Sequence, residues 1–403
     1  MKDHEALAIH GGRPVLTTPA PPWPEVEESD RRALLEVLDS RIWGGYHPSV
    51  AELERRMAAM HGATFGIAVA NGTVSLEIAL LALGIGPGDE VIVPPISFVA
   101  SATAIARVGA VPVFADVDAQ TINLNPAPAT EAITDRTRAI VLVHFAGLPA
   151  DLDAFVALCR ERRLALIEDC AHAPGAVWQG RPVGSFGAFG SFSFQASKNL
   201  TAGEGGMLVT SDPGLAEVAR SISNQGRRTG GAWYEHVRVG TNARLTGFQA
   251  ALLLSQLDRL PAQMRRRTES AERLRRGLRA VDGLQVTPKT LDPRVDAHAY
   301  HIFSMMLHPG RFGASRAQVV AAVAAEGVPA TTSYPHPLYR NPLFERYPHR
   351  TGDCSHAEAY CREGIWLAHQ ALLAEPAWID GVIAAFLKVR AHAGSLAPVR
   401  PSA

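Results

Sequence analysis

The chain has few cysteines, no net charge and no long apolar run, and each absence excludes a class of protein. Its 403 residues contain four cysteines without CxxC spacing, so we expect free thiols instead of a disulfide scaffold. Basic and acidic residues balance at 39 each, which argues against nonspecific nucleic-acid or anionic-lipid partners. No run approaches the roughly 20 apolar residues of a membrane helix, and no signal-peptide pattern is present. We therefore expect a cytoplasmic protein with neither nucleic acid nor membrane as a partner.

Two patterns resemble binding motifs but have the wrong spacing. Cys354, His356 and Cys361 form one cluster without a second pair of ligands, so we expect no metal site there. The glycines between residues 184 and 190 enter a strand, whereas a dinucleotide fingerprint joins a strand to a helix. Close backbone packing explains these glycines better.

Lys198 is the strongest candidate for chemistry. It follows the apolar stretch 191–195 and precedes the glycine-rich bend 202–206. A lysine amine becomes nucleophilic near neutral pH when burial disfavours its ammonium form, and a strand end facing a cleft provides such burial. The alternative is a surface lysine in a turn.

Asp169 ends a second apolar run, at residues 164–169, and His172 follows it. The run is typical of a central parallel strand, and ligands bind beyond the carboxyl ends of such strands. Asp169 could instead cap the next helix. Together, Lys198 and Asp169 match what pyridoxal 5'-phosphate (PLP) requires, namely a lysine for the imine and an aspartate for the pyridine nitrogen.

Residues 68–79 predict a strand, a polar glycine turn and a helix, which is the usual cradle for a phosphate. Gly72 and Thr73 would donate backbone N–H groups, and Ser193 could add a hydroxyl. An ordinary Asn or Ser helix cap is the alternative interpretation.

The chain resembles the DegT/DnrJ/StrS family of PLP-dependent sugar and aminocyclitol aminotransferases, which have fold type I of the aspartate aminotransferase superfamily. The resemblance extends over nearly the whole length and depends on seven motifs in order. These are LAIHGGRPV (7–15), ANGT (70–73), PPISFV (94–99), EDCAHA (168–173), SFSFQ (191–195) with Lys198, AGEGG (202–206) and GTNARLTGFQ (240–249).

The resemblance implies a role for each matching residue. Lys198 would carry the cofactor, Asp169 would pair with the pyridine nitrogen, and His172 would lie beside the ring as a third catalytic residue. Phe98 would stack on the ring, although an aromatic residue in an apolar run can also be plain core. Asn242 would reach the phosphate bound by a neighbouring subunit, which requires a homodimer with shared active sites.

The implied reaction is a ping-pong transamination through pyridoxamine phosphate. Glutamate or glutamine would give its amino group to a keto sugar or a keto cyclitol, in antibiotic or cell-surface sugar biosynthesis. Four residues are candidates for substrate contact, namely Gln195, Arg244, Tyr334 and His336. We identify no residues for a metal in this scheme.

The pattern of the chain predicts an α/β fold with three segments. Apolar runs at 65–70, 90–95, 111–117, 139–146, 164–169, 188–194 and 206–210 predict a seven-stranded, mostly parallel sheet between layers of helices, with the last strand antiparallel to its neighbour. We expect an N-terminal arm at 1–25, a large PLP-binding domain at 26–260 and a smaller α+β domain at 261–403. In the last part, a strand is expected at 301–307 and helices near 316–326 and 376–392.

Three other functions fit parts of this pattern. The same cofactor could support dehydration and aromatisation, as in the aminohydroxybenzoate synthases of this fold. Sugar dehydratases of the family replace the lysine by histidine, so Lys198 counts against them. A noncatalytic regulatory protein would need a separate binding module, and the sequence contains neither such a module nor a lost lysine.

Overall fold

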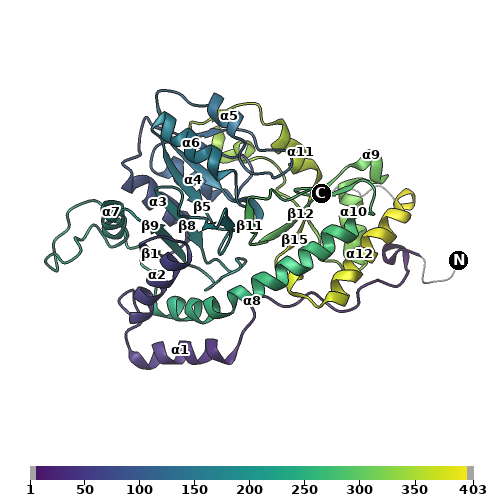
Figure 1. Cartoon of the computed structure of the whole chain (residues 1–403), viewed down its shortest axis with the longest axis horizontal. Helices are drawn as coiled ribbons and strands as arrows, with labels where there is room; N and C mark the ends of the chain where they lie inside the picture. Colours follow the sequence, from purple (N-terminus) through teal and green to yellow (C-terminus); the bar gives the residue numbers. More distant parts are fainter. Residues whose placement is uncertain (1–5, 397–403) are drawn as a thin grey trace.

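A large β-sheet with helices on both faces is the centre of the computed structural model, which describes residues 6–396 (Figure 1). Its strand order is β1–β9–β8–β5–β4–β2–β3–β14. Strand β9 is antiparallel to both neighbours, as expected for a strand that follows β8 through a short link, and the other pairs are parallel. The strands are β1 (Phe65–Val69), β2 (Glu90–Val93), β3 (Val111–Phe114), β4 (Thr137–Val143), β5 (Ala165–Asp169), β8 (Phe189–Ser193), β9 (Gly206–Thr210) and β14 (Arg350–Thr351).

The prediction of seven strands was wrong by one. The eighth, β14, comes from far along the chain and pairs in parallel with β3 through Arg350 and Thr351. Two residues are too few to show a hydrophobic period, so the sequence carried no signal for this edge strand.

Alternating side chains of the strands fill two apolar cores, one on each face of the sheet. In β4, Ile140 and Leu142 enter the first core, while Ala139 and Val141 enter the second. The first core is covered by α2 (Pro48–Met60), α6 (Leu152–Arg162) and the first half of α8 (Gly247–Leu278). The second is covered by α3 (Gly72–Ala82), α4 (Ala100–Arg107) and α7 (Pro213–Ser223).

A third core lies in the C-terminal part of the molecule, around an antiparallel sheet in the order β10–β12–β15–β13. Leu7 and Leu16 from the N-terminal segment pack into this core. Its elements are β10 (Leu284–Val286), β12 (Ile302–Leu307), β13 (Thr331–Thr332), β15 (Gly364–Ala368), α9 (Pro309–Phe312), α10 (Arg316–Ala325) and α12 (Pro376–Ala391). The strand expected at 301–307 and both expected helices are confirmed.

Helix α8 connects the two parts and crosses the domain boundary expected at residue 260 (Figure 1). It contains Pro261, and its 32 residues begin with a capping box between Thr246 and Gln249. The ends of the expected arm and C-terminal domain, residues 1–5 and 397–403, lie outside the described residues. The remaining elements are α1 (Glu28–Ser40), α5 (Pro126–Glu131), α11 (Ser355–Glu363), β6 (Val177–Trp178), β7 (Arg181–Pro182) and β11 (Val295–Ala297).

None of the helices in residues 6–396 combines the length and apolar character needed to cross a membrane.

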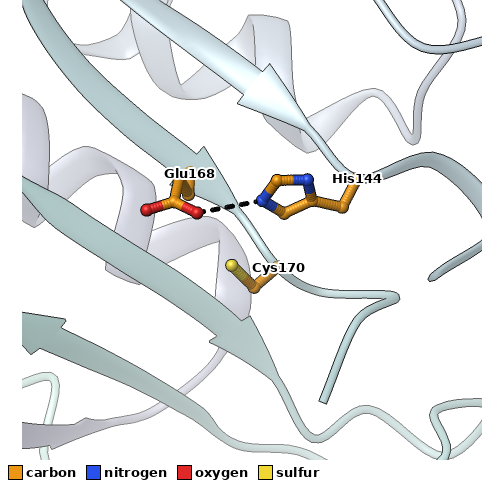
Figure 2. Close-up of side chains that lie close together, drawn as sticks. All are labelled: His144, Glu168 and Cys170. Atoms are coloured by element: carbon orange, nitrogen blue, oxygen red, sulfur yellow. Dashed lines mark hydrogen bonds and ion pairs between the residues drawn. The ribbon is translucent and has the colours of Figure 1, made fainter. Parts of the chain in front are cut away.

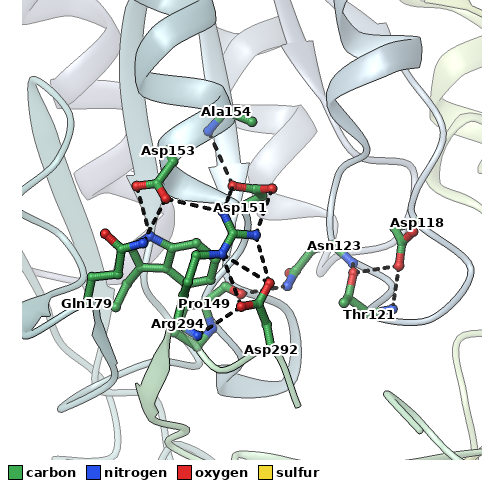
Figure 3. A network of polar contacts seen from close by, with 11 residues as sticks. Asp118, Thr121, Asn123, Pro149, Asp151, Asp153, Ala154, Gln179, Asp292 and Arg294 are labelled. Carbon is green, nitrogen blue, oxygen red and sulfur yellow. Dashed lines mark hydrogen bonds and ion pairs between the residues drawn. The ribbon is translucent and has the colours of Figure 1, made fainter. Parts of the chain in front are cut away.

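Arg294 joins the segment before β11 to the start of α6 (Figure 3). Its guanidinium donates to Asp292 at 2.7 Å and to Asp151 and Asp153 at 3.2 Å. Its carbon atom Cζ lies 4.5 Å from the ring centroid of Trp178. The side chain of Arg294 is 35% exposed, so water screens these ion pairs in part.

We predict that Arg294→Ala lowers the free energy of unfolding by about 1 kcal/mol at pH 7, because three neighbouring carboxylates lose their shared cation. Hydrogen bonds from Arg294 lower the pKa of Asp292 in the folded state. This stabilisation is therefore complete above the unfolded pKa of aspartate, near 4, and is lost as the pH falls through the lower folded pKa. Urea unfolding at pH 7 and pH 3 measures the difference between variant and wild type.

Arg311→Ala is the control, because within residues 6–396 Arg311 forms an ion pair with the half-exposed Asp282 alone. An Arg294→Ala effect no larger than that of the control, or one that does not shrink at pH 3, would contradict the role of the network.

Candidate functional site

A cavity of about 840 Å³ lies where several sheet strands reach their carboxyl ends. Strands β1, β4, β5 and β8 each deliver a lining residue at or just after their last residue, which is where ligands bind in open α/β sheets. The structure brings together eight of the residues selected from the sequence. They are Gly72, Thr73, Phe98, Asp169, His172, Ser193, Gln195 and Lys198.

Lys198 lies in the turn between β8 and β9, and its backbone N–H donates to the carbonyl of Gln195 at 2.8 Å. Burial lowers the pKa of the Lys198 amine to about 8, against the opposing effect of the negative charge on Asp169. About one tenth of an amine with this pKa is unprotonated at pH 7, roughly three hundred times the fraction for an ordinary lysine. The amine is therefore suited to act as a nucleophile and as a base.

Asp169 is the last residue of β5 and is buried beside the cavity. Ser101 Oγ donates to Asp169 Oδ2 at 2.7 Å, and the N–H of Ala171 donates to Oδ1 at 3.2 Å. Ser97 Oγ lies 2.7 Å from Ser101 Oγ and must donate to it, because the proton of Ser101 is already used. Each carboxylate oxygen keeps lone pairs for a further donor, so Asp169 can accept a hydrogen bond from a ligand.

The N-terminus of α3 forms one wall of the cavity through Gly72 and Thr73. The first N–H groups of a helix have no intrahelical partner and carry a partial positive charge. Asn71 caps the helix by accepting from the N–H of Val74 at 2.9 Å. A Cβ added to Gly72 would lie 2.7 Å from the Cβ of Ser193, so only glycine allows these two walls to approach. The result is a polar recess suited to an anion.

His172 and Phe98 supply the aromatic surfaces of the cavity. The imidazole of His172 is buried, and its Nδ1 atom has no hydrogen-bond partner among residues 6–396. Burial, with the charge of Lys198, holds the pKa of His172 well below its usual value, so the ring is neutral at pH 7. Phe98 is 58% exposed, which fits a ring that contacts a ligand and excludes the alternative that it is plain core.

Four predicted residues do not line this cavity in the described chain. Asn242 is exposed on the segment before α8. Arg244 lines a second cavity of about 380 Å³, where it donates to Asn224 Oδ1 at 2.8 Å. Tyr334 packs edge-on against Trp366, and burial with the nearby charge of Asp169 raises its pKa. His336 lies 3.1 Å from the carbonyl of its neighbour Pro337.

Sequence reasoning missed the polar residues that support the cavity. Ser97 and Ser101 orient Asp169, and serines in a loop and a short helix gave no signal for that role. Glu77 and Arg107 form an ion pair at 2.6 Å along the lining, between helices α3 and α4. Such a pair depends on how the two helices pack, which no local pattern reveals.

A buried cluster of His144, Glu168 and Cys170 lies at the carboxyl ends of β4 and β5 (Figure 2). These three residue types can bind metals, but here the side-chain atoms of Glu168 and His144 are engaged in hydrogen bonds. Glu168 accepts hydrogen bonds from the N–H groups of Gly184, Phe186 and Gly187 at 2.7–2.9 Å, and from His144 Nε2 at 3.1 Å. The other nitrogen of His144 accepts from the N–H of Ala150 at 3.1 Å. The cluster therefore anchors a loop and fits a structural role instead of a metal site.

We predict that Glu168→Ala lowers the free energy of unfolding by about 3 kcal/mol or more, because three backbone N–H groups and one imidazole lose their acceptor inside the protein. Glu168→Gln should fall between wild type and Glu168→Ala, since an amide keeps one acceptor oxygen. Chemical unfolding of the three proteins tests this order. A loss below about 1 kcal/mol for Glu168→Ala would show that the loop does not depend on this carboxylate.

Comparison with known proteins agrees with this geometry. A Micromonospora echinospora protein with the provisional name L-glutamine:3-amino-2,3-dideoxy-scyllo-inosose aminotransferase is 41% identical, covering 97% of this chain and 99% of its own. The L-glutamine:2-deoxy-scyllo-inosose aminotransferase of the same organism is 38% identical, with 96% and 98% covered. The crystal structure of 3-amino-5-hydroxybenzoic acid synthase superposes with a TM-score of 0.87 at 35% identity, covering 93% of this chain and 99% of that one.

The family model matches residues 24–386, nearly the whole described chain. The resemblance inferred from the seven motifs is confirmed, and the chain belongs to the DegT/DnrJ/EryC1/StrS aminotransferase family.

Proposed function

We propose that the chain is a PLP-dependent aminotransferase that moves the amino group of L-glutamine to a keto cyclitol. The observation that carries this proposal is Lys198, an amine with a pKa of about 8 in a cavity that also holds a buried carboxylate and a helix N-terminus. We also propose that the reaction takes place in the cytoplasm and belongs to the synthesis of an aminocyclitol antibiotic.

The cavity fits PLP on three independent grounds. The first turn of α3 and the hydroxyl of Ser193 would hold the phosphate, because unpaired N–H groups at a helix start attract anions. Asp169 would accept from the protonated pyridine nitrogen with its free lone pairs. The unpartnered Nδ1 of His172 and the exposed ring of Phe98 suit an aromatic ring with polar substituents.

Bound PLP would accept the amino group and withdraw electrons from the carbon that carries it. The chain must then hold the cofactor still and move a proton. Ser97 and Ser101 hold Asp169 in place, and its negative charge keeps a facing ring nitrogen protonated. Lys198 Nζ is unprotonated often enough at neutral pH to take up a proton and deliver it again. Because His172 is neutral, it adds no positive charge that would compete with this proton transfer.

The amino donor and the ketone acceptor are inferred from the names of two relatives. Two relatives that match nearly the full length carry names with L-glutamine as donor and a scyllo-inosose derivative as acceptor. We therefore favour glutamine over glutamate and a ring ketone without a nucleotide. Gln195 is the proposed substrate contact that lines the cavity, while Tyr334 and His336 do not line it.

A homodimer would complete the site. Asn242 and Arg244 lie outside the cavity in one chain, on or beside a segment with the exposed aromatic side chains of Trp233 and Tyr234, at 79% and 77% exposure. We propose that a second copy brings its Asn242 to the phosphate recess and its Arg244 toward the substrate.

A second candidate is dehydration and aromatisation to an aminohydroxybenzoate. The support for it is the superposition with 3-amino-5-hydroxybenzoic acid synthase. An aromatic product absorbs strongly in the near ultraviolet, whereas an aminated cyclitol does not, so the product spectrum separates the two reactions.

We predict that the protein reconstituted with PLP absorbs visible light and that L-glutamine bleaches this band. Lys198→Ala should lose this band, and its turnover should fall by at least about a thousandfold, because no other amine can replace the buried Lys198. Absorption spectra before and after each donor measure this.

Lys289→Ala is the matched control, since Lys289 lies outside the cavity, and it should behave as wild type. Turnover that persists in Lys198→Ala would overturn the assignment of the lysine. A band that glutamine leaves unchanged would favour the second candidate.

For the dimer, we predict that Lys198→Ala and Asn242→Asp are each nearly inactive alone but restore activity when co-expressed. A mixed dimer then holds one intact site, so a random mixture should reach about a quarter of wild-type activity. Activity of the purified mixture is the measurement. Without any recovery, Asn242 and Lys198 would have to serve the same site from one chain.

A further inference from the structure

Two buried histidines of the C-terminal part contact the residues on either side of Lys198. His369 follows β15, and its Nε2 lies 2.9 Å from the carbonyl oxygen of Ser197. His301 precedes β12, and its Nδ1 lies 2.9 Å from Oδ1 of Asn199. Because β12 and β15 are paired, the two histidines are neighbours, and the N–H of His369 donates to the carbonyl of His301 at 3.1 Å.

The hydrogen-bond partners of His369 determine which of its ring nitrogens carries the proton. Arg267 Nη2 lies 3.2 Å from His369 Nδ1, and a guanidinium can only donate. Nδ1 of His369 is therefore the acceptor, and the ring proton is on Nε2, from which it is donated to Ser197. A second proton on Nδ1 would face the guanidinium, so Arg267 holds this imidazole in its neutral form.

The partners of Asn199 fix the proton of His301 in the same way. The amide nitrogen of Asn199 donates to the carbonyl of Ala299 at 2.7 Å, so its oxygen faces His301. His301 must then donate from Nδ1. Each side of Lys198 is held by one imidazole N–H from the C-terminal part.

The imidazole rings of His172, His301 and His369 form a continuous stack. Ring centroids are 4.2 Å apart between His172 and His301, and 5.5 Å apart between His301 and His369. Burial holds the pKa of all three well below the usual value, so the stack is uncharged at neutral pH. The charged groups that act on this stack are then Lys198 and Arg267, and Asp169 acts on Lys198.

We propose that His301 and His369 are positioning residues that hold the Lys198 turn in place and make its geometry depend on the C-terminal part of the chain. Neither contacts the reacting atoms. The turn otherwise has local support from Gln195, whose side-chain oxygen accepts from the N–H of Ser197 at 2.9 Å. When an imidazole is removed, the turn loosens and water reaches the amine.

This inference rests on the proposed role of Lys198, but it can be tested without the cofactor. The chain has only four lysines, Lys2, Lys198, Lys289 and Lys388. Full-length protein with ¹³C-methylated lysines therefore gives few NMR signals, and the Lys198→Ala variant assigns one of them. A pH titration of that signal measures the pKa of Lys198, which is about 8 in the wild type.

We predict that His301→Ala and His369→Ala each raise the pKa of Lys198 by about one unit or more, toward its ordinary value, because the amine becomes hydrated. His301→Asn and His369→Gln should keep it near the wild-type value, because Asn places a donor at the Nδ1 position and Gln places a donor at Nε2.

His298→Ala is the control for a purely structural loss. His298 is equally buried in the same segment and stacks on Tyr300 at 3.8 Å, but it makes no hydrogen bond to residues 195–199. It should lower the melting temperature without moving the pKa of Lys198.

The proposal is overturned if neither alanine variant moves the pKa of Lys198, or if His298→Ala moves it equally. Should His369→Ala fail to fold because Arg267 loses its acceptor, the pair His301→Ala and His301→Asn decides alone.

In the PLP-loaded protein, the same alanine variants should shift the pH at which the visible band changes. Absence of any band would count against the proposed function, while the NMR titration would still decide the positioning role.

Discussion

Burial of the single amine of Lys198 is the constraint on which the site depends. Moving an ammonium group away from water disfavours its charge, and this effect outweighs the attraction of Asp169 enough to bring the pKa to about 8. The fold maintains the burial by placing the lysine in the connection 194–205 between two antiparallel strands, at the edge of the cavity. A looser turn would return the amine to water and to its ordinary pKa.

Adjacent acids in β5 divide their roles because consecutive side chains of a strand point to opposite faces. Glu168 turns away from the cavity and saturates its oxygens with loop N–H groups and His144. Asp169 turns toward the cavity and keeps lone pairs free beside Ser101. The first carboxylate fixes the strand end, and the second is available to a ligand.

Much of this arrangement could be predicted from the sequence. The seven longer strands and the residues at their carboxyl ends follow from apolar runs that stop at polar residues, so Asp169, Ser193 and Lys198 were found together. Strand β14 was missed because two residues show no period. Ser101 was missed because Asp169 is distant in sequence and meets it only when α4 packs beside β5. His301 and His369 were missed because only the packing of the two parts brings them to the residues on either side of Lys198.

The most direct test of the proposed reaction follows the nitrogen itself. The protein reconstituted with PLP is incubated with scyllo-inosose or 2-deoxy-scyllo-inosose and L-glutamine labelled with ¹⁵N at the α-amino group, and the product is analysed by mass spectrometry. The account predicts an aminocyclitol that carries one ¹⁵N atom, with loss of the label from glutamine. An unlabelled product, or an aromatic amine in its place, would contradict it.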